Sequence, residues 1–391
     1  MKNKTENKKN LQPKLRFRDF INDGDWNGEL GSVLFDSISN KKHNSDLPIL
    51  AITQEHGAIP RDKIDYRVSV TEKSIESYKV VEVGDFIISL RSFQGGIEYS
   101  KYKGLCSPAY VILRRKRDDH EGFFKHYFKT NRFIEDLNRD IEGIRDGKMV
   151  SYDQFSKLIV PLPKSKIEQQ KIADCLSSLD ELIETEDKKL EALQRHKKGL
   201  MQELFPGEGQ TLPKRRFPEF QNSPKWKEKP LGKLFTIGNG RDYKHMSKGD
   251  IPVYGTGGYM LSVDDYLYDG ESVCIGRKGT IDKPIFLTGK FWTVDTLFYT
   301  HSFKDCIPKF IFLIFQNIKW RNHNEAGGVP SLSKTNIEKI ISAIPLIPEQ
   351  KRIADFLSSI DDQITAQTKK LDSLRLHKKG LMQQLFPNPD N

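Results

Sequence analysis

Two stretches of the chain carry apolar residues that recur at alternating steps of four and three. In the first stretch these are Ile172, Leu176, Leu179, Ile183, Leu190, Leu193, Leu200 and Leu204. In the second they are Ile353, Leu357, Ile360, Ile364, Leu371, Leu374, Leu381 and Leu385. This spacing is typical of a long helix that packs along a seam against another helix. From its first to its last position, each seam corresponds to a helix of about 48 Å.

The two stretches are copies of one another. Residues 172–206 and 353–387 are identical at 22 of 35 positions, at a fixed offset of 181. Polar residues interrupt both seams at the same places, namely Glu186 and Lys197 in the first and Gln367 and Lys378 in the second. Equal lengths and matched interruptions favour helices that pair with each other in antiparallel orientation. The alternative is that each helix packs back on its own globular domain.

The ends of these helices carry further signals. Ser165 and Glu168 have the spacing of a capping box at the start of the first helix, and Pro348 suits the first turn of the second. Gly199 and Gly380 lie inside the helical pattern, where each costs about 1 kcal/mol relative to alanine. They indicate either a close approach of the helices or a break before the last turn.

The remaining sequence predicts two globular domains. Residues 13–165 and 213–347 contain short β-rich runs bounded by Gly, Asp and Pro, and each has an aromatic segment that suits a helix, at 122–137 and 308–320. The expected fold class is α+β: two similar mixed α/β domains separated by two long antiparallel coiled-coil helices, with a pseudo-twofold internal repeat. The expected boundaries are a disordered basic arm 1–12, a first domain 13–165, a central long helix 166–206, a linker 207–212, a second domain 213–347, a C-terminal long helix 348–387 and a tail 388–391.

Alignment of the two domains pairs loops that suit contact with DNA. After one strand come Arg91, Ser92, Gln94 and Gly95 in the first domain, and Arg277, Lys278, Gly279 and Thr280 in the second. After another strand come Thr53 and Gln54 in the first, and Tyr254, Thr256 and Gly257 in the second. Glycine allows close backbone approach, arginine can bind guanine in bidentate fashion, and glutamine can do so for adenine. Each loop alone also fits an ordinary turn, but recurrence in both domains favours DNA contact.

Composition and charge agree with such a partner. The chain has 63 Lys and Arg against 53 Asp and Glu, a net charge of +10 that favours a polyanion. Four scattered cysteines exclude a disulfide framework and a Cys-x-x-Cys zinc site, and they fit a reducing cytoplasm. The longest apolar runs, 309–315 and 340–348, are too short to cross a membrane.

Motifs of catalysis are missing. Residues 328–335 lack the second glycine of a phosphate-binding loop, and there is no His-Glu-x-x-His motif. The Asn/Asp-Pro-Pro-aromatic tetrapeptide of an adenine methyltransferase does not occur. His196 and His377 recur beside two lysines on the predicted helices, which suits a solvated or interface histidine better than a catalytic one. The sequence therefore predicts a reader of DNA and not an enzyme.

The whole chain resembles the DNA specificity subunit of Type I restriction-modification systems. The motifs that carry the resemblance are the RFRDF and RRFPEF segments with Trp26 and Trp226, the IGRKGTIDKP loop at 275–284, the proline-rich helix starts at 161–173 and 345–354, and the two LMQxLFP helix ends. One departure is the extra residues at 164–167, where the second helix start has only Pro348 and Glu349. The start of the first helix is therefore defined only to within a few residues.

The resemblance implies a function and a set of partners. Each domain would read one half of a bipartite target in double-stranded DNA, and the helices would set the gap between the halves. Two methyltransferase subunits and restriction subunits would bind the chain. S-adenosylmethionine, ATP and Mg²⁺ would belong to those subunits, and this chain would hold no cofactor or metal.

Three other classes of protein are weighed against this one. A stand-alone methyltransferase would need the missing tetrapeptide and a glycine-rich cofactor strand. A coiled-coil scaffold would need no basic loops in its globular domains. A stand-alone DNA-binding protein of the same build, acting without methyltransferase or restriction partners, remains open.

Overall fold

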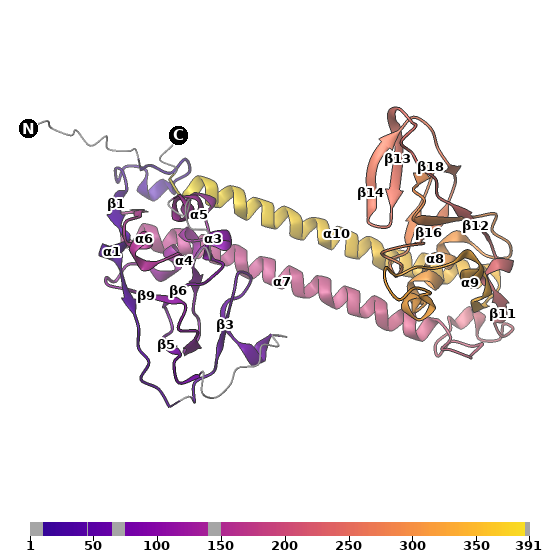
Figure 1. Ribbon diagram of the computed structural model, residues 1–391, viewed down its shortest axis with the longest axis horizontal. Coiled ribbons are helices and arrows are strands. Elements are labelled where there is room, and N and C mark those ends of the chain that lie inside the picture. Colours follow the sequence, from indigo (N-terminus) through magenta and orange to yellow (C-terminus); the bar gives the residue numbers. More distant parts are fainter. Residues whose placement is uncertain (1–10, 45, 65–74, 140–149, 388–391) are drawn as a thin grey trace, which may run out of the picture. The chain divides into compact units, whose positions relative to one another are not determined.

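The computed structural model describes residues 11–44, 46–64, 75–139 and 150–387. The chain divides into two compact units, Met1–Asp187 with Lys370–Asn391 (unit 1) and Lys188–Lys369 (unit 2). Nearly all of the predicted arm 1–12 and the whole tail 388–391 lie outside the described residues. Each unit combines one globular domain with segments of both long helices (Figure 1).

The domain of unit 1 is built on a four-stranded antiparallel sheet. Its strand order is β2 (Phe35–Ile38), β9 (Val111–Arg115), β6 (Phe86–Ile88) and β7 (Glu98–Tyr99). Three antiparallel pairs accompany it: β1 (Asn27–Leu30) with β10 (Ile159–Leu162), β3 (Leu50–Thr53) with β4 (Gly57–Pro60), and β5 (Lys79–Val81) with β8 (Gly104–Cys106). The helical segments are η1 (Arg18–Phe20), α1 (Gly31–Leu34), η2 (Arg61–Lys63), α3 (Ser92–Gly95), α4 (Glu121–Tyr127), α5 (Asn131–Asn138) and α6 (Tyr152–Ser156).

Aromatic residues form the core of this domain. Phe35 on β2 contacts Phe124 on α4 with ring centroids 5.0 Å apart, and Phe128 contacts Phe133 at 4.7 Å. The aromatic segment predicted as one helix is two helices, because the Thr130 side chain accepts from the Phe133 N–H and so begins α5 as its N-cap. The segment 122–137 therefore folds back on itself, which places both of its apolar faces in the same core.

The domain of unit 2 has two four-stranded sheets. One has the order β12 (Thr236–Asn239), β19 (Leu297–His301), β16 (Ser272–Gly276) and β17 (Ile285–Leu287). The other has the order β14 (Gly258–Val263), β13 (Lys248–Gly255), β18 (Lys290–Thr293) and β15 (Tyr268–Asp269). The pair β11 (Lys227–Pro230) with β20 (Ile341–Ile344) and the helical segments η3 (Pro218–Phe220), η4 (Leu231–Lys233), α8 (Pro308–Asn317), η5 (Trp320–His323) and α9 (Lys334–Lys339) complete it.

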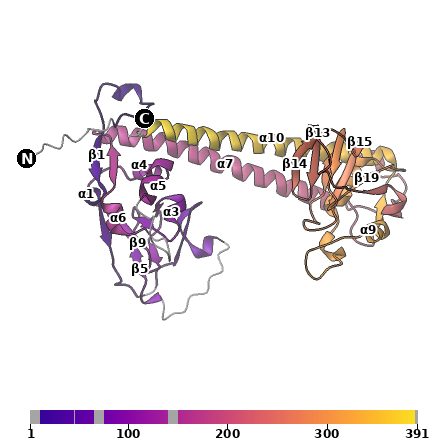
Figure 2. The same ribbon diagram turned by 45° about the horizontal axis from the view of Figure 1, so that its top comes forward.

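The two long helices are α7 (Lys166–Leu204) and α10 (Ile347–Leu385). All sixteen predicted apolar seam positions are buried or half-buried. Inside unit 1, Asp180 of α7 is bonded to Lys378 of α10, and Glu186 lies 2.5 Å from Lys370. Residue numbers that rise along α7 meet numbers that fall along α10, so these segments run antiparallel, as predicted (Figure 2).

The polar interruptions of the seam have partners on the facing helix. Inside unit 2, Lys197 donates to Asp361 at 2.8 Å, which repeats the contact of Lys378 with Asp180 in unit 1. The two glycines in the helices have neither of the roles considered above. The helices continue through Gly199 and Gly380, and a Cβ atom added at either position would meet nothing within 4 Å.

The C-terminal end of each long helix completes a domain core. In unit 1, Phe386 just after α10 contacts Phe123 and Tyr127 of α4 with ring centroids 5.3 and 5.6 Å apart. In unit 2, Phe205 just after α7 contacts Phe310 of α8 at 5.4 Å. Each helix therefore begins against one domain and ends inside the core of the other unit. No helix in the described part of the chain has the length and apolar character needed to cross a bilayer.

Candidate nucleic-acid interface

A buried carboxylate near the start of each long helix fixes that helix to the domain from which it emerges. Glu168, 1% exposed, accepts from Arg16 Nε and Nη2 at 2.7 and 2.8 Å and from Trp26 Nε1 at 3.3 Å. In unit 2, Glu349 binds Arg216 and Trp226 in the same way. Glu168 was expected in a capping box, and this expectation is wrong. A carboxylate so deeply buried needs a cationic partner, which a backbone N–H does not provide.

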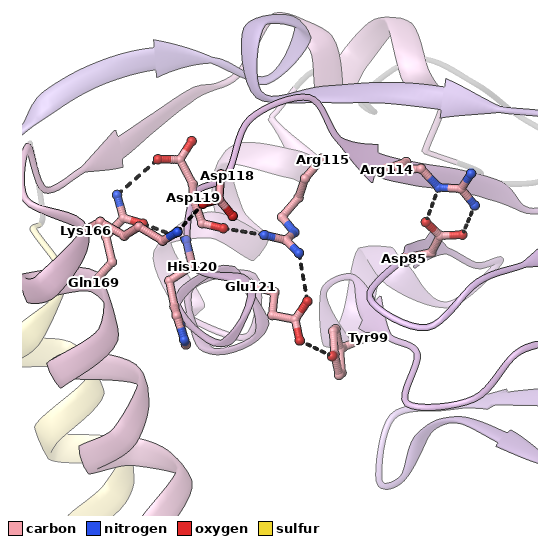
Figure 3. A network of polar contacts seen from close by, with 10 residues as sticks. All are labelled: Asp85, Tyr99, Arg114, Arg115, Asp118, Asp119, His120, Glu121, Lys166 and Gln169. Carbon is pink, nitrogen blue, oxygen red and sulfur yellow. Dashed lines mark hydrogen bonds and ion pairs between the residues drawn. The ribbon is translucent and has the colours of Figure 1, made fainter.

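The glutamine after each of these carboxylates forms a second attachment. Gln169 accepts from the His120 N–H at 2.8 Å and donates to Asp119 at 3.2 Å, as Figure 3 shows. In unit 2, Gln350 accepts from the Ile307 N–H at 3.0 Å. The repeated Glu-Gln sequence at the helix starts is thus explained by domain attachment, and the repeated arginine and tryptophan upstream serve the same purpose.

A cleft of about 400 Å³ lies beside this attachment in unit 1. Its lining residues are Val83, Gly84, Asp85, Arg114, Arg115, Arg117 and Asp118. Arg114 binds Asp85 at 2.7 Å, and Arg115 binds Glu121 at 2.8 Å (Figure 3). Arg117, the third arginine of the lining, binds Asp119 at 3.1 Å. All three arginines are thus paired with carboxylates, which makes the cleft a poor site for a DNA phosphate.

The predicted reading loop of unit 1 is a single helical turn, α3. Arg91 and Gln94 are exposed, which suits contact with DNA. Ser92 is 1% exposed, and its hydroxyl oxygen accepts from the Ser89 N–H at 2.9 Å. Ser92 is therefore part of the turn, and its prediction as a DNA contact is wrong for this conformation.

The second predicted loop of unit 1 lies against the first. Gln54 donates from Nε2 to the Arg91 carbonyl at 3.3 Å, and a Cβ added to Gly95 would come within 2.5 Å of the Gln54 side chain. Thr53 uses its hydroxyl in the β3–β4 turn, where it accepts from the His56 N–H at 3.0 Å. Gln54, Arg91 and Gly95 are thus brought together, whereas the Thr53 hydroxyl is committed to the turn.

The two predicted loops of unit 2 also meet. Thr256 and Gly257 form the tip of the β13–β14 hairpin, in which half-buried Tyr254 pairs with Tyr259. A Cβ added to Gly279, whose φ is +86°, would lie 3.8 Å from Thr256 Oγ1. Arg277, Lys278 and Gly279 are exposed, and Thr280 is half-buried. The strand β16 therefore delivers a basic loop beside the hairpin tip, as β6 delivers Arg91 beside Gln54.

A third segment of unit 2 joins this surface, and the sequence reasoning missed it. The Gly279 N–H donates to the Pro330 carbonyl at 2.9 Å, and the Leu332 N–H donates to the Arg277 carbonyl at 2.9 Å. Val329, next to Pro330, is 67% exposed. The paired glycines at 327 and 328 were the available signal, but only residues 328–335 were compared with a motif, that of a phosphate-binding loop.

Metal binding has no support among the residues that the structure describes. That part of the chain contains no group of three or more His, Cys, Asp or Glu side chains placed to hold an ion. The four cysteines are free thiols, and burial raises the pKa of Cys106 to about 12 and that of Cys306 to about 11.

Comparison with known proteins gives the family. The model of the Type I restriction modification DNA specificity domain matches the chain twice, over residues 29–195 and 224–376. The chain belongs to this family. The predicted resemblance to Type I specificity subunits is thereby confirmed, together with the two-domain repeat.

Two relatives of this specificity-family chain come from Methanocaldococcus jannaschii. The type I restriction enzyme MjaX specificity subunit is 26% identical and covers 88% of each chain, and the MjaVIII specificity subunit is 23% identical over 82% of this chain and 81% of its own. The crystal structure of the Type-I restriction-modification system S subunit from M. genitalium matches with a TM-score of 0.61 at 17% identity. It covers 97% of this chain and 100% of that one, a likeness of fold.

Proposed function

We propose that this chain is the DNA-reading subunit of a Type I restriction-modification complex, in which each domain reads one half of a bipartite target. The observation that carries the proposal is the repeated arrangement at the ends of β6 and β16. In both domains an exposed arginine follows a strand within three residues, and a second loop lies directly against the segment around that arginine. An exposed arginine on a loop of fixed geometry suits bidentate binding to guanine.

The long helices take two roles in this proposal. They set the gap between the half-sites, and they offer docking surfaces to two methyltransferase subunits, to which restriction subunits are added. S-adenosylmethionine, ATP and Mg²⁺ are held by those subunits. The chain itself contributes recognition and no catalytic group, since the sequence lacks the methyltransferase tetrapeptide.

Methylome sequencing of cells with and without this gene tests the proposal. The expected result is a gene-dependent methylated motif made of two short half-sites with a fixed unspecified gap. The purified chain alone is expected to methylate no DNA. If the chain binds a specific sequence but no methylation depends on it, the protein acts without methyltransferase partners and the proposal is refuted.

A separate experiment tests whether the length of the helices sets the gap between the half-sites. Four residues inserted into each helix, after Asp187 and after Thr368, lengthen each by about 6 Å and keep the seam near its phase. At roughly 3.4 Å per base pair, the gap is expected to grow by one or two base pairs while both half-site sequences stay unchanged. A matched insertion in the linker 207–212 is the control and should leave the gap as it is. If methylation is retained in the helix variant and the gap is unchanged, the length of the helices does not set the gap.

A further inference from the structure

The short helix α3 is held by side chains from three other segments of unit 1. Gln54 donates to the Arg91 carbonyl at 3.3 Å, Asn138 to the Phe93 carbonyl at 2.6 Å and Lys129 to the Gly95 carbonyl at 2.9 Å. A single turn of helix is not stable alone, and its last carbonyls have no partner within the helix. Asn138 and Lys129 bind the Phe93 and Gly95 carbonyls, which have no partner within the helix. Gln54 adds a bond to the Arg91 carbonyl, which also accepts from the Gln94 and Gly95 N–H groups at 2.9 and 3.3 Å.

The contact of Lys129 is part of a buried ion pair. Lys129 Nζ lies 2.5 Å from Glu98 Oε1, and Glu98 is only 2% exposed. Burial raises the pKa of Glu98 and lowers that of Lys129, so the pair is held at an electrostatic cost. A buried ion pair that is replaced as a whole by apolar residues often costs no stability, whereas removal of one partner leaves the other charge buried and unpaired. Stability alone is therefore a weak reason for this pair, whereas orientation of the Gly95 carbonyl explains it.

The corresponding loop of unit 2 is held differently. The Arg277 N–H donates to the Thr296 carbonyl at 2.7 Å, and Gly279 and Leu332 complete backbone bonds between residues 277–279 and 330–332. Residues 277–279 are thus held directly by backbone bonds, whereas the segment 91–95 is held in part by side chains. The two domains therefore present their arginines by different means.

We propose that Lys129, Asn138 and Gln54 are positioning residues that fix the segment 91–95 for reading of the first half-site. This inference rests on the proposed function of the chain. It reassigns Gln54, which was expected to contact DNA, to support of Arg91. A reading side chain must be held within a fraction of an ångström of its working geometry, so loss of a support lowers discrimination before it lowers folding.

Methylome sequencing of cells that carry the intact complex tests this with three variants: the double variant Lys129→Met with Glu98→Leu, which leaves no unpaired buried carboxylate, and the single variants Asn138→Ala and Gln54→Ala. The expected result is that one base position of a single half-site relaxes, with discrimination there falling roughly ten-fold, while the other half-site stays strict. Lys157→Met is the matched control, since Lys157 is 71% exposed and lies outside the site. It should leave both half-sites unchanged.

Each outcome decides the matter. If the double variant abolishes methylation while Asn138→Ala and Gln54→Ala leave both half-sites strict, the Lys129–Glu98 pair is needed only for folding and the inference is overturned. The same holds if all three variants keep the wild-type motif. If the wild-type gene itself produces no bipartite motif, the proposed function fails first, and this result is distinct from a failure of the variants alone.

Discussion

Replacement of Phe386 by alanine is expected to destabilise unit 1 and to leave unit 2 intact. The Phe386 ring is 5% exposed and packs against Phe123 and Tyr127 of α4. Truncation of a buried phenylalanine costs about 3–5 kcal/mol, because the apolar contact is lost and a cavity remains. That is a large part of the roughly 5–15 kcal/mol that holds a typical domain folded.

Hydrogen–deuterium exchange read by mass spectrometry can resolve the effect by segment. In Phe386→Ala, the amides of α4 and α5 should exchange faster by about 100-fold or more, the factor that corresponds to about 3 kcal/mol when exchange needs unfolding of the unit. Those of α8 should keep their protection. Phe205→Ala is the matched variant, because Phe205 contacts α8 in the same manner. It should show the reverse pattern.

Two results would refute this reasoning. If both variants weaken both units equally, the helix ends contribute to one cooperative structure and not to separate cores. If Phe386→Ala leaves α4 fully protected, the ring adds little to the core despite its burial, and the cost of the cavity has been overestimated.

Three further outcomes are expected. Glu168→Ala leaves the Arg16 guanidinium, 10% exposed, without its buried partner, and should lower the stability of unit 1 by about 3–5 kcal/mol, seen as a lower melting temperature. His126 has its pKa lowered to about 3 by burial and by the nearby charges of Lys125 and Lys378, against the partial opposition of Asp180. Below about pH 6.5 the unfolded chain binds a proton at His126 and the folded chain does not. The free energy of unfolding should therefore fall by up to about 1.4 kcal/mol per pH unit as the pH drops from 6.5 toward 5. The melting temperature of His126→Gln should fall less over the same pH range. Arg277→Ala should relax one position of the second half-site, at about 1–3 kcal/mol, in the methylome, whereas uniform weakening over all sequences would mark a phosphate contact.

The long helices and their pairing could be predicted because a heptad seam is a local pattern. Every apolar position of that seam proved buried or half-buried, and even the interruptions were informative, since Lys197 and Lys378 each face an aspartate. The loops that we propose to read DNA were predicted from a second local feature, a strand followed by arginine and glycine. Both kinds of pattern need no knowledge of distant parts of the chain.

What escaped prediction depends on contacts between residues remote in sequence. Glu168 looked like a cap until its partner Arg16 was seen, and the burial of Ser92 follows from the fold of the turn around Ser89. The docking of Phe386 against α4 joins residues from opposite ends of the sequence. No spacing pattern in the sequence predicts such a contact, because it depends on how segments that are remote in sequence pack together.

The position of Phe386 in the core of unit 1 also means that this core is completed late during synthesis of the chain. Phe123 and Tyr127 leave the ribosome long before Phe386, their partner just after α10, exists, and at about 5–20 residues per second the delay is on the order of 10–50 s. Unit 2 has no such delay, because Phe205 precedes α8 in the chain. During this interval the Phe123 and Tyr127 rings lack this partner, so the nascent first domain is expected to be more open to chaperones and proteases. A chain truncated after the linker 207–212 would lack α10 and Phe386. Its first domain could not complete its aromatic core, and the cell would be expected to clear it quickly.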